Sequence, residues 1–425
     1  MMFDIQERSA VMERMLGVYI HIPFCASKCS YCDFYSLAGQ ESKMEKYQRA
    51  LIKHIEEATP QMEPYYIDTL YFGGGTPSFY GAKYICEIFN ALKRSAKVLK
   101  SSEVTVEMNP DTVTQEDLHM LKSEGVNRIS LGVQSANDDI LKLIGRRHSF
   151  KQAEQAVRMA KAEGFENISL DLIYGLPSQT KNDWADTLSK CIALRPQHFS
   201  CYGLKLEDGT PICKYRGSAF LPDDDDQADM YLYMTDILEH YGYPQYEISN
   251  FSLPGRESKH NLKYWLLDEY MGFGPGAHSF IGGTRYSYVR DLDKYIEGVS
   301  GNADIIDEYE DTDKLGRAAE YIMLGMRTIR GISKDEYTAV YRSDFDKIEY
   351  LLGEYEKKGW TRRSGIRWCF TSSGFLLSNI LIGTLLEAQS QAKMSANPWI
   401  IEPTGGTGPE TSILEAADEE NPQEQ

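Results

Sequence analysis

The sequence predicts an α/β fold, an incomplete (β/α)6 barrel of the TIM type followed by a small, mostly helical C-terminal domain. Three observations lead to this prediction. From Gly17 onward, short β-rich segments alternate with amphipathic helical segments, which is typical of parallel strands joined by right-handed crossovers. Unusual polar or glycine-rich residues follow several of these strands, where barrels of this type place their chemistry. From about Asp311 the chain becomes helical again.

The pattern predicts six strands, at residues 18–22, 69–72, 104–107, 128–133, 167–172 and 199–204. It predicts helices between them at 44–57, 80–92, 115–124, 150–163 and 184–193, and further helices at 228–241, 314–328 and 375–386. Six strand–helix units are fewer than the eight of a complete barrel, so the barrel is expected to be incomplete. The domain prediction is an N-terminal arm (1–16), the partial barrel (17–245), a connecting segment (246–310), the C-terminal domain (311–390) and a disordered acidic tail (391–425).

The composition favours a globular protein and excludes several classes. Hydrophobic residues make up 42% of 425 residues, and the formal net charge is −18, whereas nucleic-acid binders normally carry a basic stripe. The N-terminal residues lack a secretory signal, and no run of ~18 apolar residues predicts a membrane anchor. Five of the eight cysteines are scattered without paired spacing, so no disulfide framework is expected. We therefore expect a cytoplasmic protein.

The other three cysteines, Cys25, Cys29 and Cys32, form a C-x3-C-x2-C segment directly after the first strand. Three thiolates on one loop can each bind one iron of a cubane cluster and leave the fourth iron without a protein ligand. A zinc site usually brings its ligands as two pairs, and no second pair is present. Ordinary buried cysteines do not explain the regular spacing. The segment predicts an open [4Fe–4S] cluster.

Three glycines, Gly73 to Gly75, follow the second strand. Residues without side chains allow the backbone to approach a ligand closely, with N–H and C=O groups exposed to it. The phosphate-loop pattern G-x4-G-K-[ST] is absent, and a tight turn remains the structural alternative. Because the cysteine loop lies one strand earlier, the ligand interpretation is favoured.

Glu107, Gln134, Arg146 and Asp171 belong to the next three strand–helix units and are predicted to surround a small zwitterionic ligand. Arginine binds a carboxylate through two hydrogen bonds, and carboxylates bind ribose hydroxyls. Arg147 competes directly for the role given to Arg146.

Two further segments are interpreted structurally. The four aspartates at 223–226 suit the positive end of a helix dipole better than a metal site. Residues 272–278, GFGPGAH, resemble a dinucleotide fingerprint, but Pro275 and the lack of a following helix argue against that function. We expect a turn beside the active site, with His278 a packed or orienting residue.

These motifs carry a family resemblance. The cysteine segment followed by GGGTP resembles the radical S-adenosylmethionine (SAM) enzymes, and YIHIPFC (19–25) with DLIYGLP (171–177) resembles the oxygen-independent coproporphyrinogen oxidase family over about residues 17–385. True members of the oxidase branch carry another cysteine where this chain has Phe34. The H-N-x-x-Y-W segment from His260 to Trp265 is similar to the HemW branch, whose members are heme chaperones.

The resemblance implies a radical SAM barrel with the cluster on the three cysteines and SAM chelating the open iron. The residues implied for SAM are Tyr19, Gly74, Gly75, Thr76, Glu107, Gln134, Arg146 and Asp171, with Gly203 at the adenine. His260 is implied as the heme-linked residue, with Tyr264 and Trp265 as stacking neighbours. The alternative is that this segment anchors the barrel edge to the C-terminal domain.

The activity implied is the binding of heme and its delivery to apo-hemoproteins such as respiratory-chain enzymes. An electron donor such as flavodoxin or ferredoxin would reduce the cluster, and SAM cleavage would be slow or regulatory. The alternative is the oxidase activity, decarboxylation of coproporphyrinogen III to protoporphyrinogen IX. Neither a nucleic-acid partner nor a membrane anchor is expected.

Overall fold

The computed structural model describes residues 14–311 and 313–395. Most of the predicted N-terminal arm and residues 396–425 of the predicted tail lie outside this range. Arg14 to Leu16, which the prediction assigned to the arm, already belong to the first strand, β1 (Arg14–Ile22).

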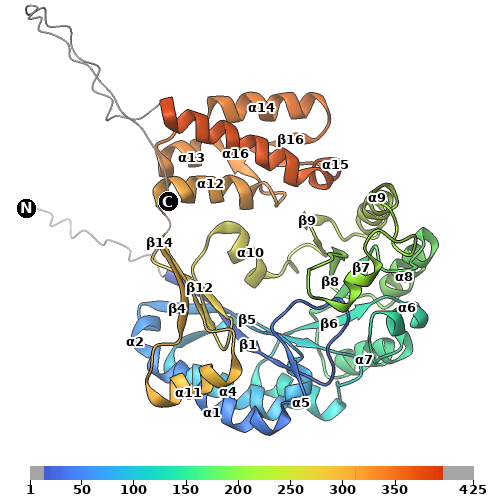
Figure 1. Cartoon of the computed structure of the whole chain (residues 1–425), viewed down its shortest axis with the longest axis vertical. Coiled ribbons are helices and arrows are strands. Elements are labelled where there is room, and N and C mark those ends of the chain that lie inside the picture. Colours follow the sequence, from blue (N-terminus) through green and yellow to red (C-terminus); the bar gives the residue numbers. More distant parts are fainter. Residues whose placement is uncertain (1–13, 312, 396–425) are drawn as a thin grey trace, which may run out of the picture.

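Six parallel strands form the centre of one twelve-stranded sheet, which curves into a partial barrel (Figure 1). They follow one another in the order β1-β4-β5-β6-β7-β8, and each neighbouring pair is parallel. The remaining five are β4 (Tyr65–Gly74), β5 (Lys97–Met108), β6 (Arg128–Gln134), β7 (Ile168–Tyr174) and β8 (His198–Gly203). All six predicted strands are present, so the predicted fold class is confirmed.

Both edges of this sheet are extended by strands that the sequence analysis did not identify. Beyond β1 lie β11 (Tyr270–Phe273), β12 (His278–Ile281), β13 (Thr284–Tyr288) and β14 (Ile306–Asp311), of which only β11 is parallel to its inner neighbour. Beyond β8 lie β10 (Asn250–Ser252) and β9 (Gln245–Glu247). A separate pair, β2 (Phe24–Cys25) and β3 (Leu37–Ala38), frames the cysteine loop. Residues predicted as a connecting segment therefore build much of the sheet.

Helices cover the outer side of the barrel (Figure 1). The long ones are α1 (Met44–Glu57), α4 (Ala82–Ser95), α5 (Gln115–Glu124), α7 (Phe150–Ala162), α8 (Lys181–Ala193), α9 (Asp224–His240) and α11 (Leu292–Gly301). Short helices are α2 (Thr59–Met62), α3 (Pro77–Tyr80) and α6 (Asp138–Leu143), with 3-10 turns at Glu41–Lys43 and Pro211–Tyr215. The predicted helix at 80–92 is interrupted because Gly81, at φ +106°, separates α3 from α4.

The aspartate run begins a helix, as predicted. The side chain of Asp223 accepts a hydrogen bond from the Asp226 N–H at 2.8 Å, and the next three aspartates form the first turn of α9. Negative charge at this end of a helix is favourable because the unpaired N–H groups make it positive.

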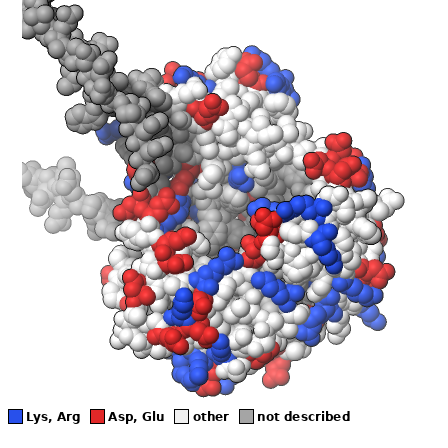
Figure 2. All heavy atoms as spheres, in the orientation of Figure 1, with Lys and Arg blue, Asp and Glu red and all other residues white. Residues whose placement is uncertain are grey.

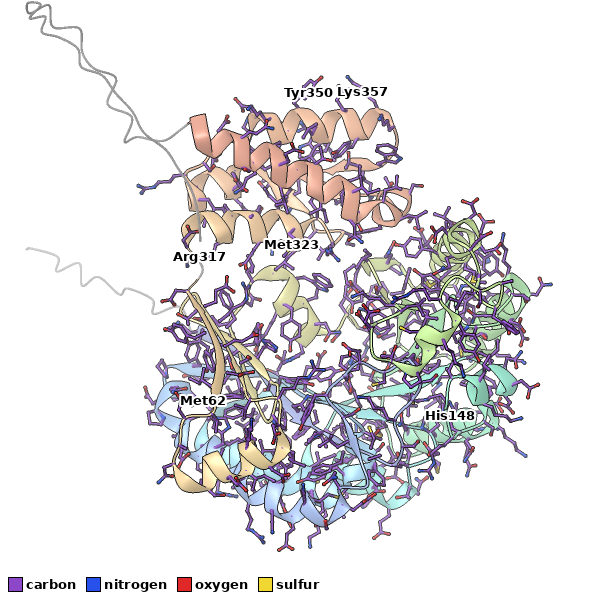
Figure 3. The ribbon with its side chains drawn as sticks, in the orientation of Figure 1. Met62, His148, Arg317, Met323, Tyr350 and Lys357 are labelled. Atoms are coloured by element: carbon purple, nitrogen blue, oxygen red, sulfur yellow. The ribbon has the colours of Figure 1, made fainter. Side chains whose placement is uncertain are left out.

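The C-terminal region is a helical layer around a small sheet. Its helices are α12 (Lys314–Gly325), α13 (Lys334–Tyr341), α14 (Asp346–Lys357), α15 (Ser372–Leu376) and α16 (Ser378–Ser395), and its strands are β15 (Ile332–Ser333), β16 (Thr361–Ser364) and β17 (Arg367–Phe370). The single helix predicted at 375–386 is therefore two helices, and 391–395 belong to α16 rather than to the predicted tail. In Figure 3, Arg317 and Met323 lie on the barrel side of α12, while Tyr350 and Lys357 lie on the outer side of α14.

The helix α10 (Lys259–Leu266) connects the two parts, because it packs against both β4 and α12. In the described ranges, no helix combines the length and apolarity needed to cross a bilayer. Lysine and arginine side chains are interspersed with aspartate and glutamate over the visible face of the molecule (Figure 2).

The inside of the barrel is polar, which sets it apart from the apolar layer under the helices. Along β6, Ile129, Leu131 and Val133 belong to the hydrophobic core, whereas Arg128 and Ser130 line a cavity. Side chains alternate between the two faces of a strand, so one face packs on the helices and the other faces the barrel interior. A polar interior of this kind provides a ligand site rather than a packed core.

Candidate functional site

A cavity of about 1070 Å³ occupies the barrel and opens at the carboxyl ends of the strands. Four parts of the chain line it: the cysteine loop, the inner faces of the barrel strands, the helix α10 and the added strands β11 to β14. Every residue predicted for the cluster and for SAM lines this one cavity. His260 does not.

The cysteine loop is held at both of its sides. The N–H of Cys32 donates to the carbonyl of Cys29 at 3.3 Å, and the N–H of Ser30 donates to the carbonyl of Ile144 at 3.0 Å. Gly145, at φ +78°, lies against the backbone of Ser30 and Cys29, so a side chain there would press on the loop. The loop therefore presents all three thiols to the cavity from a fixed backbone.

The three thiols lie close enough to influence one another. Burial raises the pKa of Cys25 and of Cys32, and the neighbouring thiols raise both further. Each thiol has a polar partner. The Cys25 Sγ lies 3.3 Å from Thr76 Oγ1, and the Cys32 Sγ lies 4.0 Å from Ser36 Oγ. Arg146 donates from Nη1 to the Cys29 Sγ at 3.7 Å. Positive charge at Arg146 suits thiolates that bind metal.

The arrangement distinguishes between a cluster and a single ion. Among residues 14–311 and 313–395, no three His, Cys, Asp or Glu side chains are grouped to hold one metal ion. A structural zinc ion needs its ligands to converge on one point, whereas each thiolate of a cubane cluster binds a different iron. Three thiols that face one cavity from a single loop fit the ligand pattern of the cluster.

The glycines after β4 do not offer free N–H groups, contrary to the expectation. Gly74 donates its N–H to Glu107 Oε2 at 3.1 Å, Gly75 donates to the Ile22 carbonyl at 2.7 Å, and Thr76 donates to the Phe24 carbonyl at 2.8 Å. A Cβ on Gly74, whose φ is +110°, would lie 2.5 Å from the His21 ring. The missing side chains let the end of β4 pack against β1 and β2, which places Thr76 beside Cys25.

Two half-buried carboxylates face the cavity, Glu107 from β5 and Asp171 from β7. Glu107 accepts a hydrogen bond from the Tyr71 hydroxyl at 2.7 Å, and burial raises its pKa to about 7. Asp171 accepts hydrogen bonds from Ser130 Oγ at 2.9 and 3.0 Å, and burial raises its pKa as well. Tyr19 stacks on Tyr71 with ring centroids 6.2 Å apart. These carboxylates are oriented acceptors for amino or hydroxyl groups.

The structure separates Arg146 from its neighbour Arg147. Arg146 donates from Nη2 to Asn109 Oδ1 at 2.8 Å and also to the Gly132 carbonyl, while its Nε is buried without a partner in the described part of the chain. Arg147 is more than half exposed, pairs with Asp111 at 3.4 Å, and does not line the main cavity. Arg146, and not Arg147, therefore presents its guanidinium to the main cavity.

Gln134 and Gly203 complete the predicted set at the ends of β6 and β8. Gln134 has φ +66°, in the left-handed region that non-glycine residues rarely adopt, and such strain is concentrated at functional sites. A Cβ on Gly203 would lie 3.0 Å from the Tyr174 hydroxyl, so a side chain would crowd this part of the cavity.

Comparison with known proteins identifies the family. A model of the Radical SAM superfamily matches residues 19–191. The heme chaperone HemW of Bacillus subtilis (strain 168) is 36% identical over 379 residues, which cover 88% of this chain and 99% of that protein. The chain belongs to the HemW family. The heme chaperone HemW of Escherichia coli (strain K12) is 31% identical over 379 residues, covering 87% of this chain and 98% of that one.

A solved structure supports the fold of this HemW-family chain. Coproporphyrinogen III oxidase (HemN) from Escherichia coli, a radical SAM enzyme, aligns with a TM-score of 0.78 over 88% of this chain and 90% of that one. The sequence identity is 23%, so the similarity establishes a shared fold and leaves the reaction open. Phe34, two residues after Cys32, is 70% exposed and lines the cavity.

The HemW-type motif lies on α10, where His260 is 1% exposed. Its Nδ1 lies 2.8 Å from Thr69 Oγ1, and its Nε2 lies 2.8 Å from the Tyr264 hydroxyl. Burial lowers the pKa of His260 to about 3. Both ring nitrogens are thus engaged within the protein, so His260 would have to break a hydrogen bond to bind iron. Tyr264 lines the cavity, and Trp265 is half-buried outside it.

Residues 272–278 form a turn beside the site, as the sequence predicted. Gly274 and Gly276 have φ +105° and +73°, and a strand rather than a helix follows. His278 was expected to be packed or orienting. It is not packed, because its side chain is exposed and lines the cavity. The reason is that His278 faces the barrel side of the added sheet, where no neighbour covers it.

Several cavity residues of this HemW-family chain escaped sequence analysis, notably Tyr71, Asn109, Arg128 and Ser130. Alternation along β6 is the signal that identifies Arg128 and Ser130, because both lie at even spacings from Gln134. Arg128 is 1% exposed, and its Nε and Nη1 have no hydrogen-bond partner in the described ranges.

Proposed function

We propose that this chain is a heme chaperone that carries a [4Fe–4S] cluster and SAM at the rim of the cavity and binds heme in the remaining space. The observation that carries the proposal is the extent of the cavity, about 1070 Å³, from the thiols to the added strands. Small-molecule sites generally occupy about 300–1,000 Å³, so this volume suits a cofactor together with a second large ligand. The curated relatives that span the chain are named heme chaperones.

Cys25, Cys29 and Cys32 would hold the cluster, and Arg146 would offset the charge of its thiolates. The bound cluster and SAM supply reductive cleavage of the sulfonium. The raised pKa values of Cys25 and Cys32 mean that metal binding must displace their protons, so loading is expected to be easier at higher pH.

The other predicted residues would hold SAM by complementary chemistry. Glu107 suits the amino group, because Tyr71 and Gly74 orient its carboxylate. Arg146 suits the carboxylate, and Asp171, held by Ser130, suits the ribose hydroxyls. Tyr19, Gln134 and the segment 74–76 would shape the site around the methionine portion, and Gly203 would leave room for the adenine.

The recipients would be apo-hemoproteins such as respiratory-chain enzymes, with flavodoxin or ferredoxin as the reductant. A free thiol loop and a labile cluster suit a reducing compartment, so we place the protein in the cytoplasm.

The test is anaerobic reconstitution with iron and sulfide, followed by hemin titration and by transfer of the bound heme to an apo-hemoprotein with a distinct Soret band. Cys29→Ala is expected to lose most of the iron and sulfide. Cys86→Ala, which removes a buried cysteine of α4 outside the cavity, is the matched control and is expected to load normally.

Tight hemin binding and transfer, without carbon dioxide release from coproporphyrinogen III, supports the chaperone function. Absence of a Soret change on adding hemin contradicts it. Stoichiometric decarboxylation with SAM and reductant would instead assign the chain to the oxidase activity.

A further inference from the structure

The cavity contains one histidine whose ring is free to bind a metal. All eight histidines lie in the described ranges, and only His21 and His278 line the cavity. The Nδ1 of His21 lies 3.0 Å from the Tyr19 hydroxyl, and its Nε2 lies 2.8 Å from the Tyr35 carbonyl. Within residues 14–311 and 313–395, the His278 side chain makes no hydrogen bond, ion pair or ring contact. An imidazole with both nitrogens open can bind a metal without breaking a hydrogen bond to the protein.

Sheet register shows that His278 faces the ligand space. Tyr19 on β1 pairs with Gly272 on β11, and His278 on β12 pairs with Ser287 on β13. Gly272 lies opposite His278, because a Cβ on Gly272 would overlap the His278 carbonyl oxygen. Residues in one row across a sheet share a face, and Tyr19 points into the barrel. His278 therefore points to the same side.

The cysteine loop forms the wall next to this histidine. Arg290, which follows β13, donates from Nη2 to the Asp33 carbonyl at 2.8 Å, and the Leu292 N–H donates to the Tyr35 hydroxyl at 2.7 Å. These bonds join residues 33–35 to the segment that follows β13. The exposed ring of Phe34 is part of the same cavity lining.

The surrounding groups match the chemistry of a metal porphyrin. Phe34 and Tyr202, 70% and 45% exposed, supply apolar rings toward a flat macrocycle. Lys28, Lys205 and Arg290 also line the cavity and suit the carboxylates of propionate side chains. His260 is instead enclosed by Thr69 and Tyr264. The cations near it, Lys263 and Arg128, are buried.

We propose that His278, and not His260, is the axial protein ligand of heme, which binds between the β12–β13 wall and the cysteine loop. This inference rests on the proposed function, since heme is the cargo in both. His260 then maintains the closed end of the barrel.

The experiment is hemin titration of anaerobically reconstituted protein, followed by absorption and electron paramagnetic resonance spectroscopy. We expect His278→Ala to bind hemin at least about tenfold more weakly and to lose the imidazole-ligated Soret position. Added imidazole is expected to restore that spectrum, which a merely structural defect would not allow. His119→Ala, at an exposed histidine outside the cavity, is the matched control and is expected to keep the wild-type spectrum.

The outcomes separate this inference from the proposed function. If wild-type protein gives no Soret change, the proposed function fails and the inference fails with it. If wild-type protein binds hemin and His278→Ala keeps the same spectrum, only the inference is overturned. The inference is also overturned if His260→Gln, shown by circular dichroism to be folded, loses the imidazole-ligated spectrum while His278→Ala retains it.

Discussion

The imidazole of His260 bridges the barrel and helix α10, because its Nδ1 lies 2.8 Å from the Thr69 hydroxyl on β4. Its other nitrogen meets Tyr264, one helical turn later, at 2.8 Å. Thr69 lies five residues before Gly74, so this bridge is at the end of the barrel remote from the cysteines. Lys263 of the same helix pairs with Asp68 at 2.9 Å, and α10 also packs on α12. The H-N-x-x-Y-W segment thus closes the barrel and joins it to the C-terminal helices.

This bridge predicts a loss of stability when the histidine is removed. His260→Leu leaves the buried Thr69 hydroxyl without its partner, which costs about 1–3 kcal/mol, and also removes the partner of the half-buried Tyr264 hydroxyl. Tyr264→Phe removes one partner at a more exposed position and should cost about 1 kcal/mol. Urea unfolding of the protein without added metal measures both variants. A His260→Leu midpoint equal to that of the wild type would show that the bridge does not stabilise the fold.

Two glycines with nearly the same backbone φ angle allow the packing between the end of β4 and the end of β1 to be measured. Gly74 and Gly81 have φ +110° and +106°, so alanine introduces similar backbone strain at both. A Cβ at Gly81 has no atom within 4 Å, whereas at Gly74 it would lie 2.5 Å from a His21 ring. That ring is fixed by Tyr19 and by the Tyr35 carbonyl and cannot move away freely.

Gly74→Ala should therefore lower the free energy of unfolding by about 1–3 kcal/mol more than Gly81→Ala does. Its reconstituted iron content should also be lower, because displacement of β4 moves Thr76 away from Cys25. Chemical unfolding and iron analysis of both variants provide the comparison. Equal values for the two would mean that the His21 ring yields and that the close packing has no cost.

The buried histidines predict acid instability. Burial lowers the pKa of His54 to about 4, from an ordinary value of about 6.5. Between these values the unfolded chain binds a proton that the folded chain excludes, so stability falls as the pH falls from about 6.5 toward 4. This one group contributes a slope of about 1.4 kcal/mol per pH unit. Burial lowers the pKa of His21, His148, His198 and His260 in the same direction.

His54→Gln should remove the contribution of His54 to the pH dependence. The unfolding free energy of this variant should therefore depend less on pH between about 4 and 6.5 than that of the wild type. Tyr295→Phe is the control, because it deletes the 2.7 Å hydrogen bond to Nδ1 but keeps the buried ring. Urea titrations at several pH values from 4 to 7 give the slopes. A His54→Gln slope as steep as that of Tyr295→Phe would contradict the assignment of His54 as a buried neutral base.

The parallel strands and the residues at their ends could be predicted from the sequence, because hydrophobic runs and local motifs encode both. The added strands were missed since β9 to β14 are only three to six residues long and pair with partners distant in sequence. The hydrogen bonds of Gly74 to Thr76 depend on how β1, β2 and β4 meet, which no local pattern specifies. His260 is buried and His278 is exposed. The burial of each histidine is set by neighbouring elements, α10 or the β11–β13 sheet, and not by its own motif.

Adjacent arginines after α6 provide a further test, because sequence alone did not choose between them. Arg146 contacts Asn109, the Gly132 carbonyl and Cys29, whereas Arg147 makes a surface ion pair with Asp111. Arg146→Gln should weaken SAM binding to reconstituted protein by about tenfold or more, since a charge-assisted contact to a carboxylate is lost. Arg147→Gln should change the affinity by less than about twofold, because exposed ion pairs contribute little. Equilibrium dialysis with labelled SAM measures both, and iron content confirms equal cluster loading. A larger effect from Arg147→Gln than from Arg146→Gln would place the SAM carboxylate outside the cavity described above.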